Sequence, residues 1–480
     1  MDTQVSKILA TFEQINTIPR QSKNEEQISN WLVDWAKSHN FEVKQDRALN
    51  VYIYVPATEG REYDPTVILQ GHMDMVCEKT PESTHDFGKD AIKHITEDDW
   101  LRADNTTLGA DNGIAIAISL VLATETTISH PALELFITVD EETGLIGANS
   151  LVKENLNGRV LLNLDSEDEG VFTIGCAGGR DVNVKQPLEV ETEFTSYETY
   201  TIAVDGLQGG HSGVDIHKER ANANIICARL LQYVYKDIPE IQLVSLFGGS
   251  AHNAIPRNAQ AQIALPSLAS EKLSTLIENV IPLLEAEHKP FEPTIKLSCI
   301  KSGETTKAYT SKATKTTIEL INALPHGIAK MSSDIKGLVE TSNNFATMDT
   351  DRDTLHICCS QRSSSIISLD WIVSKVESIA TLAEVSFETG GGYPSWQPDT
   401  NSKLLALCKK VYKNHFGKEP LIEIIHAGLE CGIIGMKIED IDMISYGPTI
   451  QNPHSPQERL YVPSLIKIWE LTKALLAEIK

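Results

Sequence analysis

The stretch "TVILQGHMDMVCEKT", residues 66–80, begins as an apolar run and then places a histidine and an aspartate two residues apart. An apolar run of this length, bounded by polar residues, is typical of a buried strand. Because side chains at i and i+2 of a strand point the same way, His72 and Asp74 are expected to project together from its end. Such a pair also occurs in ordinary polar loops, so its interpretation depends on the rest of the chain.

Other strand-like segments of the first 180 residues also end in acids. "ALELFITVDEE" (132–142) and "GRVLLNLDSE" (158–167) are short apolar runs followed by carboxylates, and "NGIAIAISLVLATE" (112–125) is long enough for a buried helix. Strands that alternate with helices predict an α/β unit built around a largely parallel sheet. Ligands of such sheets gather beyond the carboxyl ends of the strands, which is where these acids are expected to lie.

The sequence changes character after about residue 180. Strand-like runs, a Gly-rich loop and long helical patterns follow, and they predict a second domain of the α+β class. "GGGYPSWQPD" (390–399) is a Gly/Pro-rich break, after which helical patterns resume. We therefore expect a mostly parallel-sheet domain made of residues 1–181 and 391–480, with an α+β domain, residues 182–390, inserted into it.

Composition limits the classes of function. The 480 residues carry a formal net charge of −24, which argues against nucleic acid or an anionic membrane as partner. No basic segment followed by an apolar core opens the chain, and no apolar run approaches the roughly 20 residues of a membrane span. None of the eight cysteines forms a Cys-x-x-Cys pair, so free thiols are expected. These features predict a soluble, cytoplasmic protein.

Histidines and acids recur at the predicted strand ends in a defined order. Imidazole and carboxylate ligands together suit Zn²⁺, Mn²⁺ or Co²⁺. Clustered carboxylates would repel one another without a cation, and a pair of metals would relieve that repulsion and supply what peptide hydrolysis needs. Read singly, Asp111 could cap a helix, and the other acids could be solvated charges. Their joint order favours a metal site made of His72, Asp74, Asp111, Glu141, Glu142, Asp165 and His454.

This order resembles that of the cocatalytic zinc peptidases of the M20 clan. The chain is more closely similar to the bacterial aminoacyl-histidine dipeptidases, also called peptidase D or cytosol nonspecific dipeptidase, from its N-terminus to its end. One departure is Asn105, where a glycine is expected; it lies outside the ligand set. The resemblance is carried by "QGHMDMVCEK", "WLRADNTTLGADNGIAIA", "TVDEETGLIGA", "LLNLDSEDEG", "GGHSGVDIHKERANAN", "NAIPRNA" and "GLVETSNN".

The resemblance implies two divalent metal ions, with zinc favoured over manganese or cobalt. Asp111 bridges the two ions in this scheme. Glu141 is implied to be the general base and acid, and Asp74 the catalytic group that orients His72. The metal ligands are His72 and Asp165 at one ion, Glu142 and His454 at the other, and Asp111 at both.

The resemblance also implies that residues 1–181 and 391–480 form the catalytic domain and that the inserted domain, residues 182–390, is a lid. Five further residues are expected to bind the substrate. His211 is implied to polarise the scissile carbonyl, although a surface-loop histidine is the alternative. Arg362 could clamp the free carboxylate or form a surface ion pair, and Asn253 could bind polar atoms or form an Asx turn. Gly428 offers a backbone contact, and Glu430 could read the free amine of the substrate.

The expected function is metal-dependent hydrolysis of unblocked dipeptides, of the Xaa-His type and with β-Ala-His open. One alternative is a deacylase of N-acyl amino acids with the same fold, which would have no ammonium group for Glu430 to recognise. Another is a non-catalytic peptide-binding protein, which would have no use for Glu141. A homodimer is the expectation for the family, although the large inserted domain could take the place of a second copy.

Overall fold

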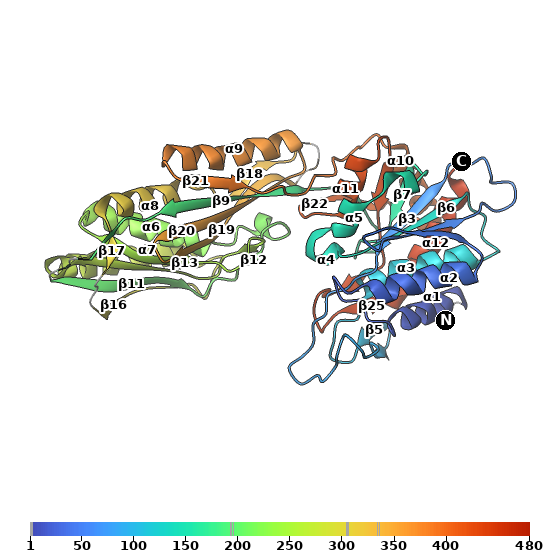
Figure 1. The fold of residues 1–480 in the computed structure, drawn as a ribbon, viewed down its shortest axis with the longest axis horizontal. Helices are drawn as coiled ribbons and strands as arrows, with labels where there is room; N and C mark the ends of the chain where they lie inside the picture. Colours follow the sequence, from blue (N-terminus) through green and yellow to red (C-terminus); the bar gives the residue numbers. More distant parts are fainter. Residues whose placement is uncertain (1–2, 193, 195, 304–306, 334, 336) are drawn as a thin grey trace. The chain divides into compact units, whose positions relative to one another are not determined.

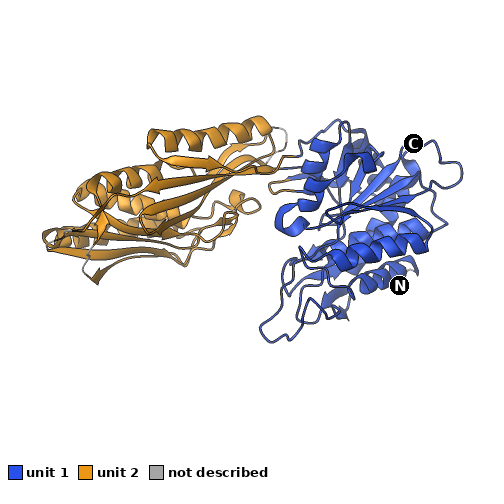
Figure 2. Ribbon diagram, in the orientation of Figure 1, with its two compact units in different colours: residues 1–176, 396–424, 429–480 blue, residues 177–395, 425–428 orange. Residues whose placement is uncertain are grey.

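The computed structural model describes residues 3–192, 194, 196–303, 307–333, 335 and 337–480. They form two compact units (Figure 2). Unit 1 consists of residues 1–176, 396–424 and 429–480, and unit 2 consists of residues 177–395 and 425–428. The expected boundaries, 181/182 and 390/391, compare with 176/177 and 395/396 in the structure. The short return of the chain to unit 2 at residues 425–428 was not expected.

Unit 1 is built around an eight-stranded sheet, and the predicted α/β class is confirmed (Figure 1). Its four inner strands run parallel, in the order β6, β3, β7 and β23. Antiparallel pairs join β1 to β2 and β2 to β6 on one side, and β23 to β8 on the other. In sheet order the strands are β1 (Glu42–Gln45), β2 (Val51–Val55), β6 (Leu133–Thr138), β3 (Val67–His72), β7 (Val160–Asn163), β23 (Asp442–Ser445), β8 (Val171–Cys176) and β22 (Leu421–Ile425).

The inner strands are apolar because helices cover the sheet. Every residue of β3 and of β6 is buried, as is usual for parallel strands with layers on both faces. The helix α3 (Ala110–Thr124) is buried on nearly all sides, since it contacts β3, β6 and α1 (Thr3–Ile15). The other helices are α2 (Glu26–Ser38), α4 (Glu141–Gly144), α5 (Ile146–Ser150), α10 (Lys403–Phe416), α11 (Glu430–Lys437) and α12 (Val462–Glu478).

A four-stranded sheet completes unit 1. It contains β24 (Ile450–Gln451), β25 (Arg459–Tyr461), β5 (Trp100–Ala103) and β4 (His94–Glu97). The loop between β24 and β25 carries the "NPHSPQE" segment, residues 452–458. This sheet therefore joins the segment before α3 to the C-terminal part of the chain.

Unit 2 is a nine-stranded sheet whose described pairs are all antiparallel. Its main path is β16 (Lys296–Gly303), β11 (Tyr197–Asp205), β15 (Ala259–Pro266), β13 (Gln242–Gly248), β19 (Val339–Asp351), β20 (Thr354–Ser363), β9 (Gly178–Pro187) and β21 (Ser386–Thr389), and β18 (Gly327–Met331) pairs with β19. Four helices pack on it and share one apolar core with the strands: α6 (Ala223–Asp237), α7 (Ser270–His288), α8 (Ser311–Ala323) and α9 (Ile366–Leu382).

The eight cysteines are free thiols, as the sequence predicted. In the described parts of the chain, no helix combines the length and the apolar character that a membrane crossing requires.

Candidate metal centre

The candidate ligands meet where neighbouring parallel strands end. His72 is the last residue of β3, Glu142 lies in α4 just after β6, and Asp165 follows β7 by two residues. Because β6, β3 and β7 are parallel neighbours, their carboxyl ends lie at one edge of the sheet. The prediction that the acids gather beyond this edge therefore agrees with the strand order.

Two groups of ligand atoms share one carboxylate. Atoms of His72, Asp111 and Asp165 lie within 4.8 Å of one another, and atoms of Asp111, Glu142 and His454 form a second such group. Asp111 Oδ1 lies 3.1 Å from His72 Nε2, and Asp111 Oδ2 lies 3.0 Å from His454 Nε2. The two oxygens of Asp111 thus face two different imidazoles, which is the arrangement that a bridging carboxylate requires.

Each of the two imidazoles also lies near a second carboxylate. Asp165 Oδ1 lies 3.4 Å from His72 Nε2, and Glu142 Oε2 lies 3.1 Å from His454 Nε2. His72 is buried, whereas the His454 side chain is 50% exposed. One group is therefore enclosed by the protein and the other borders on solvent.

Asp111 owes its position to an unusual helix start. The N-cap of α3 is Gly109, with a φ of 68°, and the backbone is non-helical at Asp111, with φ −80° and ψ 105°. The carboxylate oxygens of Asp111 face His72 and His454 rather than the N–H groups of the helix, so the alternative of a side-chain N-cap is wrong. The following residue, Asn112, accepts a hydrogen bond from His72 N at 3.2 Å and donates one to Leu164 O at 2.9 Å. Asn112, which the sequence did not single out, ties the ends of two strands to the helix.

Asp74 holds both the histidine and the acidic turn. Its Oδ1 accepts hydrogen bonds from His72 Nδ1 at 3.2 Å and from Glu141 N at 3.0 Å, and its Oδ2 accepts one from Glu142 N at 3.3 Å. Burial opposes the charge on Asp74, but the hydrogen bonds, first that from His72, hold its pKa below the usual value. Since Nδ1–H donates to Asp74, Nε2 of His72 is left as the metal-binding nitrogen.

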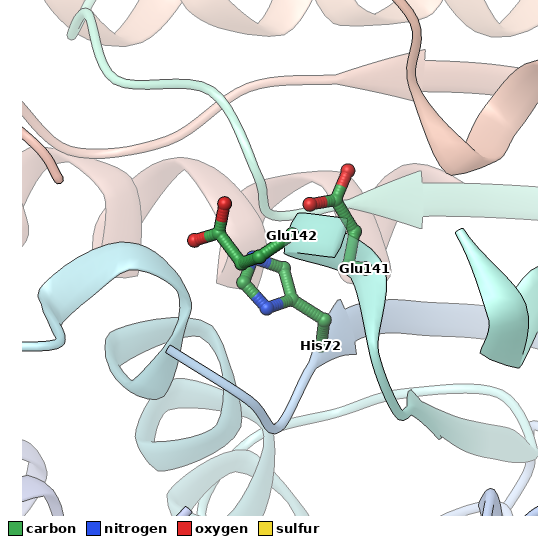
Figure 3. A group of neighbouring side chains, drawn as sticks. All are labelled: His72, Glu141 and Glu142. Carbon is green, nitrogen blue, oxygen red and sulfur yellow. The ribbon is translucent and has the colours of Figure 1, made fainter. Parts of the chain in front are cut away.

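Glu141 and Glu142 both project from the short helix α4, beside the imidazole of His72 (Figure 3). Atoms of Glu141, Glu142 and His72 lie within 4.8 Å of one another. Glu141 belongs to neither of the two groups that contain Asp111. The neighbouring glutamates are thus separated, with Glu142 beside His454 and Glu141 outside the Asp111 groups.

The electrostatics of this cluster favour a cation. Burial raises the pKa of Glu142 and of Asp165, and repulsion from Asp111 adds to both shifts. Glu142 Oε1 is buried and finds no hydrogen-bond partner among the described residues. Two imidazoles and three carboxylates are donors that Zn²⁺, Mn²⁺ and Co²⁺ accept. The residues present therefore fit two divalent ions, which would neutralise charges that the fold keeps together.

Of the residues predicted to bind substrate, His211, Asn253, Arg362 and Gly428 belong to unit 2. His211 Nδ1 accepts hydrogen bonds from Gly213 N at 3.2 Å and Val214 N at 3.1 Å. Burial, then the charge of Arg362, lowers the pKa of His211 to about 4. The imidazole is therefore neutral at pH 7, and its proton is on Nε2, which remains available as a donor.

Arg362 is 6% exposed, and its Nη1 donates a hydrogen bond to Tyr393 Oη at 2.6 Å. The alternative of a surface ion pair is therefore wrong. A Cβ on Gly428 would lie 2.7 Å from the Tyr393 ring, so this position needs a glycine. Asn253 has an exposed side chain and lines the same hollow of unit 2 as His211.

His426 is a buried polar residue that the sequence reasoning missed. Its Nε2 lies 2.8 Å from Ser342 Oγ, and burial lowers its pKa to about 3. The sequence signal that could have identified His426 is its position in "HAGLECG", a segment in which only Gly428 and Glu430 were predicted as site residues.

The role predicted for Glu430 requires correction. Its side chain is 1% exposed, and Oε2 accepts hydrogen bonds from Gln70 Nε2 and Thr138 Oγ1, both at 2.6 Å. Burial raises the pKa of Glu430 to about 7. Its Oε1 is also buried and has no hydrogen-bond partner among the described residues, so neither oxygen is open to a substrate ammonium group in this structure.

Comparisons with known proteins identify the family of this chain. A model of peptidase family M20/M25/M40 matches residues 68–478. The cytosol non-specific dipeptidase of Escherichia coli strain K12 is 38% identical over 468 residues, 98% of this chain and 96% of the relative. The crystal structure of aminoacylhistidine dipeptidase from Vibrio alginolyticus matches with a TM-score of 0.90 and 36% identity, over 99% of this chain and 97% of that one.

More distant structures share only the fold. The aminopeptidase PepT from Bacillus cereus has a TM-score of 0.57 at 17% identity, over 99% of this chain and 98% of that one. The family resemblance inferred from the sequence is thus confirmed: the chain belongs to peptidase family M20/M25/M40.

Proposed function

We propose that this protein is a metal-dependent dipeptidase that hydrolyses unblocked dipeptides, including the Xaa-His type, with β-Ala-His as a further candidate substrate. The observation that carries the proposal is the Asp111 carboxylate, which faces His72 with one oxygen and His454 with the other. The names of the two similar full-length proteins, a cytosol non-specific dipeptidase and an aminoacylhistidine dipeptidase, support the choice of substrate.

Zinc is the proposed metal at both sites, with His72, Asp111 and Asp165 around one ion and Asp111, Glu142 and His454 around the other. The mixed imidazole and carboxylate donors support this choice. When bound, the two ions supply Lewis acidity toward the scissile carbonyl and lower the pKa of a water molecule. The protein's part is to hold these ligands and to move the protons.

Glu141 is the proposed general base and acid. It shares a turn with Glu142 but lies outside the two groups built on Asp111, so it is free to take a proton from the attacking water. It then delivers that proton to the nitrogen of the leaving amino acid. Asp74 positions this turn by accepting hydrogen bonds from Glu141 N and Glu142 N while it orients His72.

The residues of unit 2 are proposed to recognise the substrate. Neutral His211 offers its Nε2–H to the carbonyl oxygen, and Arg362 binds the C-terminal carboxylate. Asn253 and the backbone of Gly428 are proposed to bind further polar atoms. A cytoplasmic location and a homodimer complete the proposal.

The first test is a substrate panel of Ala-His, β-Ala-His, a tripeptide and an N-acetyl amino acid, assayed with Zn²⁺- or Mn²⁺-loaded protein. We expect cleavage of the dipeptides alone. Glu141→Gln should lower kcat by about 10²- to 10⁴-fold, the usual contribution of general acid–base catalysis, and should retain both metal ions. The exposed Glu439→Gln serves as the control and should behave as wild type.

Cleavage of the acetylated compound alone would replace the proposal with a deacylase. No cleavage of any compound by protein that holds two metal ions would indicate a binding protein.

The second test concerns Asp74. Asp74→Asn offers an amide where two backbone N–H groups and His72 Nδ1–H need an acceptor, so metal affinity should fall about 10- to 100-fold. Calorimetric titration of the metal-free protein with Zn²⁺ measures this loss. Asp46→Asn is the matched control, because Asp46 also accepts hydrogen bonds from backbone N–H groups, those of Ala48 and Asn50. Equal affinity of the Asp74 and Asp46 variants would contradict the assigned role.

The third test concerns Arg362. Arg362→Met removes a charged donor, whose hydrogen bond to a carboxylate contributes about 1.5–3 kcal/mol. The kcat/KM for Ala-His should therefore fall roughly 10- to 150-fold. Ala-His amide lacks the C-terminal carboxylate, so Arg362→Met should leave its hydrolysis almost unchanged. Equal losses on the acid and on the amide would show that Arg362 does not bind the carboxylate.

A further inference from the structure

Glu458 is a buried carboxylate that none of the roles above uses. It lies four residues after His454, at the end of the loop before β25, and is 2% exposed. Its Oε2 accepts hydrogen bonds from Leu108 N at 2.7 Å and Gly109 N at 3.0 Å. Its Oε1 accepts from Ala110 N at 2.7 Å and Asp111 N at 3.3 Å.

Four consecutive backbone N–H groups therefore converge on one side chain that is 347 to 350 residues away in the sequence. The last of the four belongs to Asp111, whose carboxylate faces both imidazoles. Burial raises the pKa of Glu458 to about 7, and the backbone hydrogen bonds oppose this shift because they favour the ionised form, to which hydrogen bonds are stronger. The turn 108–111 cannot rotate without losing several of them at once.

The opposite side of the same turn is held by a buried arginine. Arg20 is 2% exposed, and its Nη2 donates to Gly109 O at 2.6 Å and to Asn16 Oδ1 at 3.0 Å. Its Nη1 donates to Met73 O at 3.2 Å and Asp74 O at 3.1 Å. Among the charges that stabilise the guanidinium, Glu458 contributes most. The carboxylate and its counter-charge thus enclose the turn from two sides.

Gly109 makes this enclosure sterically feasible. Its φ is 68°, and a Cβ at this position would lie 2.2 Å from Arg20 Nη2 and 2.8 Å from Met75 Sδ. A side chain here would displace the arginine from the turn.

We propose that Glu458 is a positioning residue for the metal centre, which fixes the turn of Asp111 relative to the loop of His454 before any metal binds. The inference rests on the two-metal function proposed above. Glu458 belongs to none of the ligand groups found in the described residues, so its effect on the metal centre passes through the turn of Asp111, to which it is hydrogen-bonded, and through the loop that it shares with His454. With both oxygens occupied by backbone donors, it stabilises the spacing of the ligands.

A second buried glutamate of unit 1 provides a matched control. Glu134 is 3% exposed, and its carboxylate accepts hydrogen bonds from Asn157 N and Gly158 N, each at 3.0 Å. It therefore makes the same kind of contact with a loop that carries no ligand. Glu458→Gln and Glu134→Gln each place an amide against backbone donors, so both variants should unfold at a lower temperature than wild type.

Metal affinity separates positioning from ordinary stabilisation. Metal-free wild type and both variants are titrated with Zn²⁺ by calorimetry, and the visible spectrum of each is recorded with Co²⁺. We expect Glu458→Gln to lose about 10- to 100-fold in affinity and to change the Co²⁺ spectrum, because ligand-orienting partners contribute on that scale. Glu134→Gln should retain the affinity and spectrum of wild type.

Wild-type affinity and spectrum in Glu458→Gln would overturn the inference while leaving the proposed function intact. Wild-type protein that binds neither Zn²⁺ nor Co²⁺ would overturn both. If Glu458→Gln does not fold, hydrogen exchange of metal-free wild type decides. Slow exchange of the amides of residues 108–111 supports the inference, and exchange that becomes slow only after Zn²⁺ is added overturns it.

Discussion

The carboxylate of Asp111 is the constraint on which the candidate site depends. Its two oxygens lie 3.1 Å and 3.0 Å from the imidazoles of His72 and His454, which come from opposite ends of the chain. This placement brings Glu142 and Asp165 into the same small volume, where burial and repulsion from Asp111 raise the pKa of both. A fold that keeps such charges together without a counter-ion would lose stability, so the arrangement is understandable as a site built for cations.

The sequence predicts this centre well because strand ends are local features. His72 and Asp165 follow apolar runs that can be recognised as strands, and parallel neighbours bring such ends to one edge. The order of the ligands along the chain then identifies the family, which the comparisons confirm. The helix start at Gly109 was less predictable, since its geometry depends on contacts with Arg20 and Met75 that are not local.

The errors have the same physical origin. Glu430 was expected to bind the free amine of the substrate, yet its partners Gln70 and Thr138 are 360 and 292 residues away. Asn112 was passed over as part of an apolar helix, although it hydrogen-bonds to the backbone beside two candidate ligands. Whether a polar side chain faces a site or a buried partner is decided by tertiary contacts, which residue type and spacing do not encode.

Hydrogen bonds among buried polar side chains explain why the strands beneath the metal centre are not wholly apolar. Gln70 lies two residues before His72 in β3, so the two side chains share one face of the strand, and Asn163 is the last residue of β7, two residues before Asp165. Asn163 Nδ2 donates to Gln70 Oε1 at 2.5 Å, and Gln70 Nε2 donates to Glu430 Oε2. Burying these groups costs free energy unless they are hydrogen-bonded, and the chain from Asn163 to Glu430 offsets part of that cost, while Asn163 Oδ1 and Glu430 Oε1 have no partner among the described residues. A second polar layer therefore supports the strand ends that carry the ligands.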